Sequence, residues 1–168
     1  MKYIDLVKKH GGKKVAFRNL PESHQMALVW YMAVDGDAWD ELFILRGNKT
    51  LKRNIRKVLP KYVKKYGHLK FGMVDVPTEA IKAVIEQGFD DDREFKDFDS
   101  YHKWYLLGQD IPKHSRTNRW PCILDSSNRP AHWDILEDGW HRLHFYIKDG
   151  HKTIPCISYL PKIKYKLD

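Results

Sequence analysis

The 168-residue chain carries 30 Lys and Arg against 22 Asp and Glu, a net charge of +8, and 42% of its residues are hydrophobic. This length and apolar content suffice for the core of one compact domain. No apolar run reaches the roughly 18 residues of a membrane-spanning helix, and the basic first 14 residues lack the apolar stretch of a secretion signal. We therefore expect a cytoplasmic protein with no membrane partner.

The charge is unevenly distributed along the chain. Residues 1–70 carry sixteen Lys and Arg against six Asp and Glu, whereas residues 71–110 carry four against ten. Residues 111–168 carry ten against six. This asymmetry indicates a basic face with a binding role, or a basic half that docks on an acidic one.

The first half of the chain contains helical patterns after a short strand. A strand is predicted at residues 14–18, followed by a helix that begins near Pro21 or Ser23 and ends at Gly36. Residues 39–45 form a second short helix or strand.

Residues 49–66 predict a basic amphipathic helix, which Pro60 kinks or divides. Its cations can neutralise phosphates and give salt-sensitive, sequence-neutral binding to DNA or RNA. The alternative is an ordinary amphipathic helix whose basic face is solvated. The candidate nucleic-acid-binding residues are Lys49, Lys52, Arg53, Arg56, Lys57, Lys61, Lys64 and Lys65.

The second half of the chain alternates strand and helix patterns. Strands are predicted at residues 71–76, 120–124, 133–136 and 153–159. Helices are predicted at residues 77–87, 98–107 and 140–148. A basic loop at residues 113–119 precedes the second of these strands. It can close over a ligand, with Arg116 and Arg119 on a phosphate, or can simply be solvated. The loop residues considered for this role are His114, Ser115, Arg116, Asn118 and Arg119. The two cysteines, Cys122 and Cys156, lie in apolar runs and are expected to be buried and free.

The most informative motif is an apolar run that reaches Gly139 and then the helix at 140–148. A strand, a glycine turn and a helix N-terminus together present backbone N–H groups to an anion. Arg142 can direct two N–H donors at phosphate oxygens, and His141 can add a third or act as a general acid. The candidate phosphate-binding residues are Gly139, Trp140, His141, Arg142, Arg116 and Arg119.

Two carboxylates, Glu137 and Asp138, directly precede the glycine. They can hold Mg²⁺, for which Asp138 is the candidate ligand, or deprotonate a hydroxyl for attack on a phosphoryl group. With His141 they form the candidate catalytic set. The alternative is that Asp138 caps the helix and that Arg142 pairs with one of the two carboxylates.

Histidines gather near the same turn. His141 and His144 lie three residues apart on one helix face, with His132 and His151 near them in sequence. No cysteine or third spaced ligand completes a zinc pattern, so surface or capping histidines explain the cluster more simply.

The run from Trp120 to Tyr159 resembles the ParB/sulfiredoxin-like superfamily. The resemblance rests on the ordered segments 121–124, 134–142 and 153–157, with Gly150 before the last. It implies an α+β fold, a small mixed sheet with packed helices, and a nucleotide whose phosphates lie over the His-Arg helix start. Residues 71–168 would form this core, and residues 1–70 a basic, mainly helical extension.

Members of that superfamily include CTP-hydrolysing DNA clamps, ATP-dependent sulfinic-acid reductases, nucleotide-dependent kinases and nucleases. The reductases place a nucleophilic Cys directly before the His-Arg pair, where this chain has Trp140. The resemblance therefore excludes the reductase chemistry, and the arginine-doubled motif of the clamps is absent.

The leading hypothesis is a nucleotide-binding protein that acts as a Mg²⁺-dependent phosphotransferase or nucleotide hydrolase at the Gly-Trp-His-Arg turn, with ATP or another nucleotide as its partner. The alternatives are a non-catalytic module that binds DNA, RNA or protein through residues 49–66, and a ParB-like nuclease. In the nuclease case the nucleic acid is itself the substrate.

Overall fold

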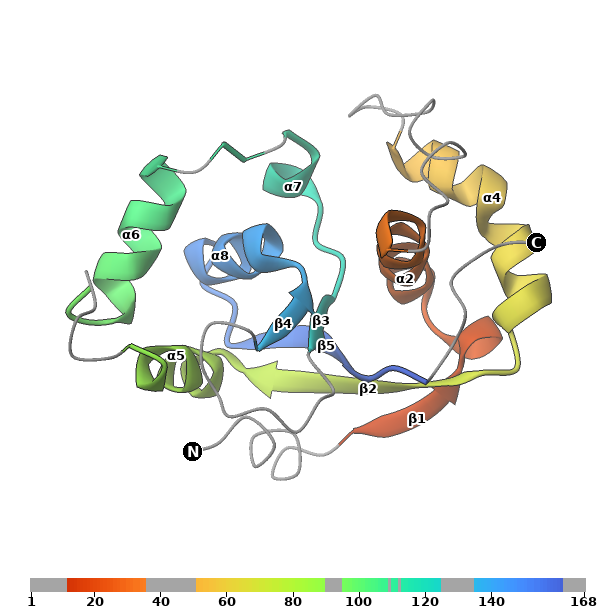
Figure 1. Cartoon of the computed structure of the whole chain (residues 1–168), viewed down its shortest axis with the longest axis horizontal. Helices are drawn as coiled ribbons and strands as arrows, with labels where there is room; N and C mark the ends of the chain where they lie inside the picture. Colours follow the sequence, from red (N-terminus) through yellow and green to blue (C-terminus); the bar gives the residue numbers. More distant parts are fainter. Residues whose placement is uncertain are drawn as a thin grey trace.

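The computed structural model describes residues 12–35, 51–89, 95–108, 110–111, 113–124 and 135–161. Within these ranges the chain forms one mixed five-stranded sheet with helices packed against it, which confirms the expected α+β class (Figure 1). The strand order is β1-β2-β5-β3-β4, and only the pair β3–β5 is parallel. The strands are β1 (Lys13–Ala16), β2 (Lys70–Pro77), β3 (Cys122–Leu124), β4 (Leu136–Asp138) and β5 (Thr153–Tyr159).

The helices of the same ranges are the 3-10 turn η1 (Phe17–Asn19), α2 (Glu22–Asp35), α4 (Leu51–Tyr66), α5 (Thr78–Gln87), α6 (Phe98–Gly108), α7 (Lys113–Thr117) and α8 (Trp140–Lys148). None of the helices in the described parts is long and apolar enough to cross a membrane.

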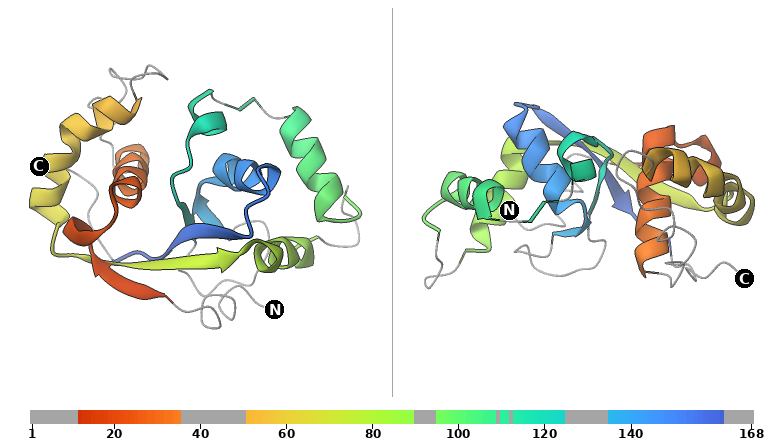
Figure 2. Two further views of the ribbon diagram at one scale, coloured as in Figure 1. Left: turned by 180° about the vertical axis from the view of Figure 1, so that it is seen from behind. Right: turned by 90° about the horizontal axis from the view of Figure 1, so that it is seen from above.

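The alternation of side chains along the strands divides the core into two clusters. Cys122 and Leu124 of β3 join the cluster that includes α5, α6 and α8, whereas Ile123 between them joins the cluster of α2 and α4. Successive residues of a strand point to opposite faces, so the two helical groups cover opposite faces of the sheet. Figures 1 and 2 show α8 with α6 on one side of β3 and β4, and α2 with α4 on the other.

The first described strand belongs to the central sheet. β1 pairs with β2 in antiparallel register from Lys13–Met73 to Ala16–Lys70. The Phe17 N–H then donates to the carbonyl of Leu69, which continues the contact beyond the strand. The sheet therefore extends across residue 70, the boundary expected from the sequence between an N-terminal extension and a C-terminal core.

The structure corrects several predicted elements. Residues 51–66 form one helix with an exposed Pro60 inside it, so the proline does not divide the segment. Residues 113–117 are the short helix α7 rather than a loop, and Ser115 within it is buried. The predicted strand at 14–18 ends at Ala16, because Phe17 enters a 3-10 turn.

Two further boundaries differ near the motif. The strand predicted at 120–124 begins at Cys122, and the strand predicted at 133–136 lies at 136–138. The final residue of the second of these strands, Asp138, therefore directly precedes the turn at Gly139. The predicted segment 39–45 and Lys49 lie outside the described residues. Cys122 and Cys156 are free and buried, as expected.

Candidate functional site

The turn between β4 and α8 requires a glycine. Gly139 has φ +103°, a left-handed conformation that other residues adopt only with strain. A Cβ atom at this position would lie 3.1 Å from the Cα of Cys122 and 3.0 Å from Nη2 of Arg142. The Gly139 N–H donates to Oδ1 of Asp138 at 2.9 Å. The glycine thus lets the helix start approach β3 closely.

Arg142 is held in the wall behind this turn. Its side chain is 7% exposed, and Nη2 donates to the carbonyl of Pro121 at 3.0 Å. The same nitrogen lies 3.7 Å from Oδ2 of Asp138, so the pair anticipated as the structural alternative is present. Nε of Arg142 and Oδ2 of Asp138 are buried without a hydrogen-bond partner among the described residues. An unsatisfied buried donor or acceptor costs about 1–3 kcal/mol.

A cavity of about 310 Å³ opens at the N-terminus of α8. The sequence motif supplies most of its lining, and α2 and α7 contribute one residue each. The residues that line this turn cavity are Glu137, Asp138, Gly139, Trp140, His141, Arg142, Ser115 and Trp30. Ser115 belongs to the segment 113–119 that was expected to close over a ligand or to be solvated, whereas Trp30, a tryptophan at helical spacing, carries no signal of its own.

The two carboxylates of the cavity have different environments. Asp138 is half-buried and already faces the Gly139 N–H and Arg142. Glu137 is exposed, and its Oε2 accepts a long hydrogen bond of 3.5 Å from Tyr31. No cluster of three or more His, Cys, Asp or Glu side chains suited to a metal is found in the described ranges. Oδ1 of Asp138 accepts the Gly139 N–H, and its Oδ2 lies 3.7 Å from Arg142, so a Mg²⁺ at this carboxylate would compete with the contact to Arg142. The role of Asp138 as a Mg²⁺ ligand stays a prediction.

His141 is oriented by α6. Its Nδ1 lies 2.7 Å from the hydroxyl of Tyr105. Burial lowers the pKa of His141, and the nearby Asp138 opposes this only in part, so the ring is neutral at pH 7. Burial also raises the pKa of Tyr105 to about 12, which keeps its hydroxyl protonated. A neutral, fixed imidazole at the cavity wall can donate or accept one hydrogen bond.

His144 is a core residue, not the surface or capping histidine that the sequence favoured. It is 0% exposed and stacks on Tyr105, with ring centroids 3.7 Å apart and an interplanar angle of 12°. Its Nδ1 lies 2.7 Å from Nδ1 of His102, so one ring donates and the other accepts. Burial, followed by the neighbouring His102 and His141, lowers the pKa of His144 to about 3.

The two arginines predicted to close over the phosphate do not line the turn cavity. Arg116 is exposed on α7. Nε of Arg119 donates to Oδ2 of Asp149 at 2.8 Å, near the far end of α8. Arg119 instead lines a second cavity, of about 240 Å³, together with Lys52 and Arg56 of α4.

The other candidate cations of α4 lie outside both cavities. Arg53, Lys57, Lys61 and Lys64 are exposed, and Lys65 is half-buried with its ammonium 5.7 Å from the ring centroid of Tyr66. Among the predicted nucleic-acid-binding residues of α4, Lys52 and Arg56 thus line a cavity and the others do not.

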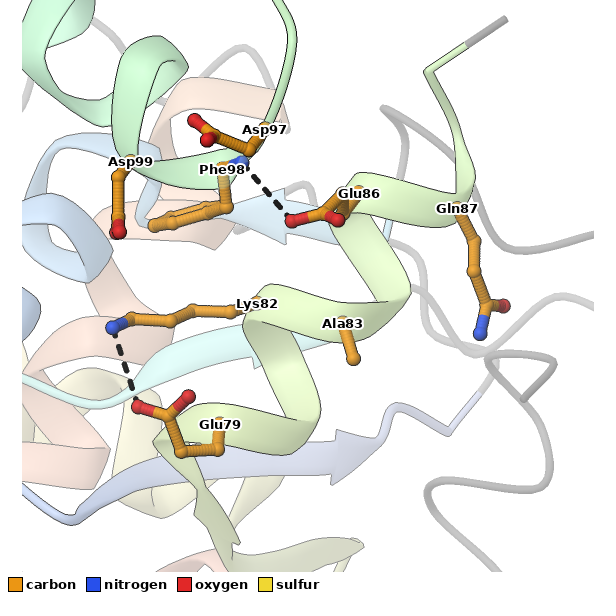
Figure 3. A pocket seen from close by; sticks show the side chains of 8 residues that line it. All are labelled: Glu79, Lys82, Ala83, Glu86, Gln87, Asp97, Phe98 and Asp99. Atoms are coloured by element: carbon orange, nitrogen blue, oxygen red, sulfur yellow. Dashed lines mark hydrogen bonds and ion pairs between the residues drawn. The ribbon is translucent and has the colours of Figure 1, made fainter.

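A larger cavity, of about 480 Å³, lies between α5 and α6 (Figure 3). Lys82 reaches Glu79 at 3.3 Å, and Glu86 accepts the N–H of Phe98 at 3.1 Å. Asp97 and Asp99 add further negative charge to its lining. This acidic lining repels phosphate, so the larger cavity is not the candidate phosphate site.

Comparison of the chain with protein-family models, with curated proteins and with solved structures finds no significant match. The ParB/sulfiredoxin-like resemblance of residues 120–159 stays a prediction.

Alanine substitutions at two glycines test how closely the turn at Gly139 approaches β3. Gly139 and Gly150 both have positive φ, but a Cβ at Gly150 would have no atom within 4 Å. We expect Gly150→Ala to lower the free energy of unfolding by about 1 kcal/mol, from backbone strain alone. Gly139→Ala is expected to cost about 2 kcal/mol more, because the Cβ also meets Cys122. Urea denaturation measures both, and equal losses would contradict the close approach.

The buried His144 makes stability depend on pH. Its pKa is about 3 in the folded chain and 6.5 in the unfolded chain, so between these values only the unfolded chain binds the proton. The free energy of unfolding then falls as the pH is lowered, by about 2 kcal/mol for this group between pH 7 and pH 5. His144→Gln should remove that part of the loss. Urea denaturation at the two pH values tests this, and an equal loss in both proteins would contradict it.

Proposed function

We propose that the protein binds a nucleotide through its phosphates at the turn cavity. The observation that carries this proposal is that the N-terminus of α8 opens at the cavity. The first N–H groups of a helix have no partner within it, and the helix dipole places partial positive charge there. Those of Trp140, His141 and Arg142 are the groups available, since the Gly139 N–H is bound to Asp138. His141 adds a neutral ring nitrogen at the same wall.

Aromatic side chains favour a nucleotide over a bare phosphate ion. Trp140 and Trp30 both line the cavity and are half-buried, so each offers an indole surface beside the phosphate position. Stacking of a base on an aromatic ring contributes about 1–3 kcal/mol. The resemblance of residues 120–159 to the ParB/sulfiredoxin-like superfamily supports the same assignment, because that family places nucleotide phosphates at this helix start.

Glu137 is the carboxylate best suited to chemistry. Asp138 and Arg142 largely neutralise each other at 3.7 Å, whereas Glu137 is exposed at the rim of the cavity. There it can deprotonate a water or hydroxyl that attacks a phosphoryl group, or contact Mg²⁺ that enters with the nucleotide. Phosphotransfer or nucleotide hydrolysis is thus the reaction class that we propose, with Glu137 as base and His141 as a phosphate ligand.

Calorimetric titration with inorganic pyrophosphate without metal tests the phosphate site. His141→Ala should weaken binding about tenfold, because a hydrogen bond to a charged group contributes about 1.5–3 kcal/mol. Glu137→Gln should tighten binding, because one repelling charge is removed from the rim. His151→Ala, an exposed histidine beyond the other end of α8, is the matched control. Absence of binding, or equal effects of the two histidine variants, would reject the site.

Turnover is tested separately with ATP or CTP and Mg²⁺. Wild-type protein should release phosphate, and Glu137→Gln should lower the rate at least a hundredfold while nucleotide binding persists. Unchanged turnover in Glu137→Gln would exclude Glu137 as the base but leave the phosphate site standing.

A further inference from the structure

The second cavity, which Lys52, Arg56 and Arg119 line, shares two walls with the turn cavity. On α2, Met26 lines the second cavity and Trp30 lines the turn cavity, one helical turn further on. On the opposite wall, Thr117 lines the second cavity and Ser115 the turn cavity. The two cavities therefore follow one another between α2 and the α7–β3 segment, which face each other in Figure 1.

A ligand that spans both cavities meets different charged side chains in each of them. Three cations line the second cavity. Arg56 pairs with Glu22 at 2.7 Å and Arg119 pairs with Asp149 at 2.8 Å, so within the described residues Lys52 is the cation of this lining without an ion pair. The turn cavity has two carboxylates against Arg142 as its one cationic side chain, since His141 is neutral. A single phosphate gains from the α8 N-terminus, but a second negative group is better placed beside Lys52, with the paired Arg56 and Arg119 next to it.

Asn118 gives the second cavity a feature that fits a base. It lines the cavity, is 4% exposed, and its Oδ1 has no hydrogen-bond partner in the described parts of the chain. When the Asn118 side chain turns toward the cavity, this amide oxygen can accept a hydrogen bond from the exocyclic amine or ring N–H of a nucleobase. Proteins bind single-stranded nucleic acid through cations along its phosphate backbone and aromatic rings on which its bases stack.

We propose that the two cavities form one cleft for single-stranded nucleic acid, with one phosphate at the α8 N-terminus and the next beside Lys52, Arg56 and Arg119. This inference rests on the proposed phosphate site and names the substrate class of that site. One turn of α2, from Met26 to Trp30, advances about 6 Å, a distance that one nucleotide unit can bridge. A duplex would instead lie on the exposed face of α4, outside the cleft.

The test compares thymidine 5′-monophosphate with the dinucleotide pTpT by calorimetric titration of the full chain. The dinucleotide should bind about tenfold more tightly, because it adds a phosphate and a base. Lys52→Glu should remove this gain and leave the monophosphate affinity unchanged. Lys57→Glu makes the same charge change on an exposed side chain of α4 that lines neither cavity, and should keep the gain.

Salt dependence provides a second readout. The slope of log affinity against log salt for pTpT should become shallower by about 0.7 in Lys52→Ala, one released counterion's contribution for a single strand, and should not change in Lys57→Ala.

The outcomes separate the two proposals. The cleft is overturned, and the phosphate site stands, if the monophosphate binds but pTpT binds no more tightly. The same conclusion follows if Lys57→Glu removes the gain in affinity as fully as Lys52→Glu does. Tighter binding of a duplex than of a single strand of equal length, equally sensitive to Lys52→Glu and Lys57→Glu, also overturns the cleft. If neither ligand binds, both proposals are rejected.

Discussion

The buried guanidinium of Arg142 joins the three segments on which the candidate site depends. It donates to the carbonyl of Pro121 at the entrance to β3, pairs with Asp138 at the end of β4, and extends from the first turn of α8. Gly139 permits this arrangement, because any Cβ there would meet both Arg142 and Cys122. The helix N-terminus is thereby fixed against the sheet, with its first N–H groups at the turn cavity.

The position of the sheet explains why that cavity has walls from distant parts of the chain. α2 and α8 cover opposite faces of the sheet, yet Trp30 of α2 and Ser115 of α7 meet the turn at the β4 edge. Along the same walls, α4 brings Lys52 and Arg56 next to Arg119. Residues of the basic first half of the chain thus lie beside the motif of the second half, which gives a physical meaning to the charge asymmetry along the sequence.

Much of the fold could be predicted from the sequence, because its signals are local. The helices at 78–87 and 140–148 and the strand at 153–159 follow from apolar periodicity and from Gly88 and Gly139. The roles of tertiary contacts could not be predicted. α7 forms in a segment that is polar throughout, and its buried Ser115 reflects packing that no local pattern reports. His144 lies in the core because Tyr105 and His102 of α6 cover it, and Arg119 turns toward Asp149 instead of the turn. The members of the site on the helix start and the segment of Ser115 were predictable, whereas Trp30 of α2 was not.

The proposed function depends on phosphate binding by the backbone at the start of α8. The most direct measurement is a ¹H–¹⁵N correlation spectrum recorded during titration with inorganic pyrophosphate. We expect the amides of Trp140, His141 and Arg142 to show the largest shifts and to saturate together. Unmoved amides at these three positions, with shifts confined to the cations of α4, would contradict it.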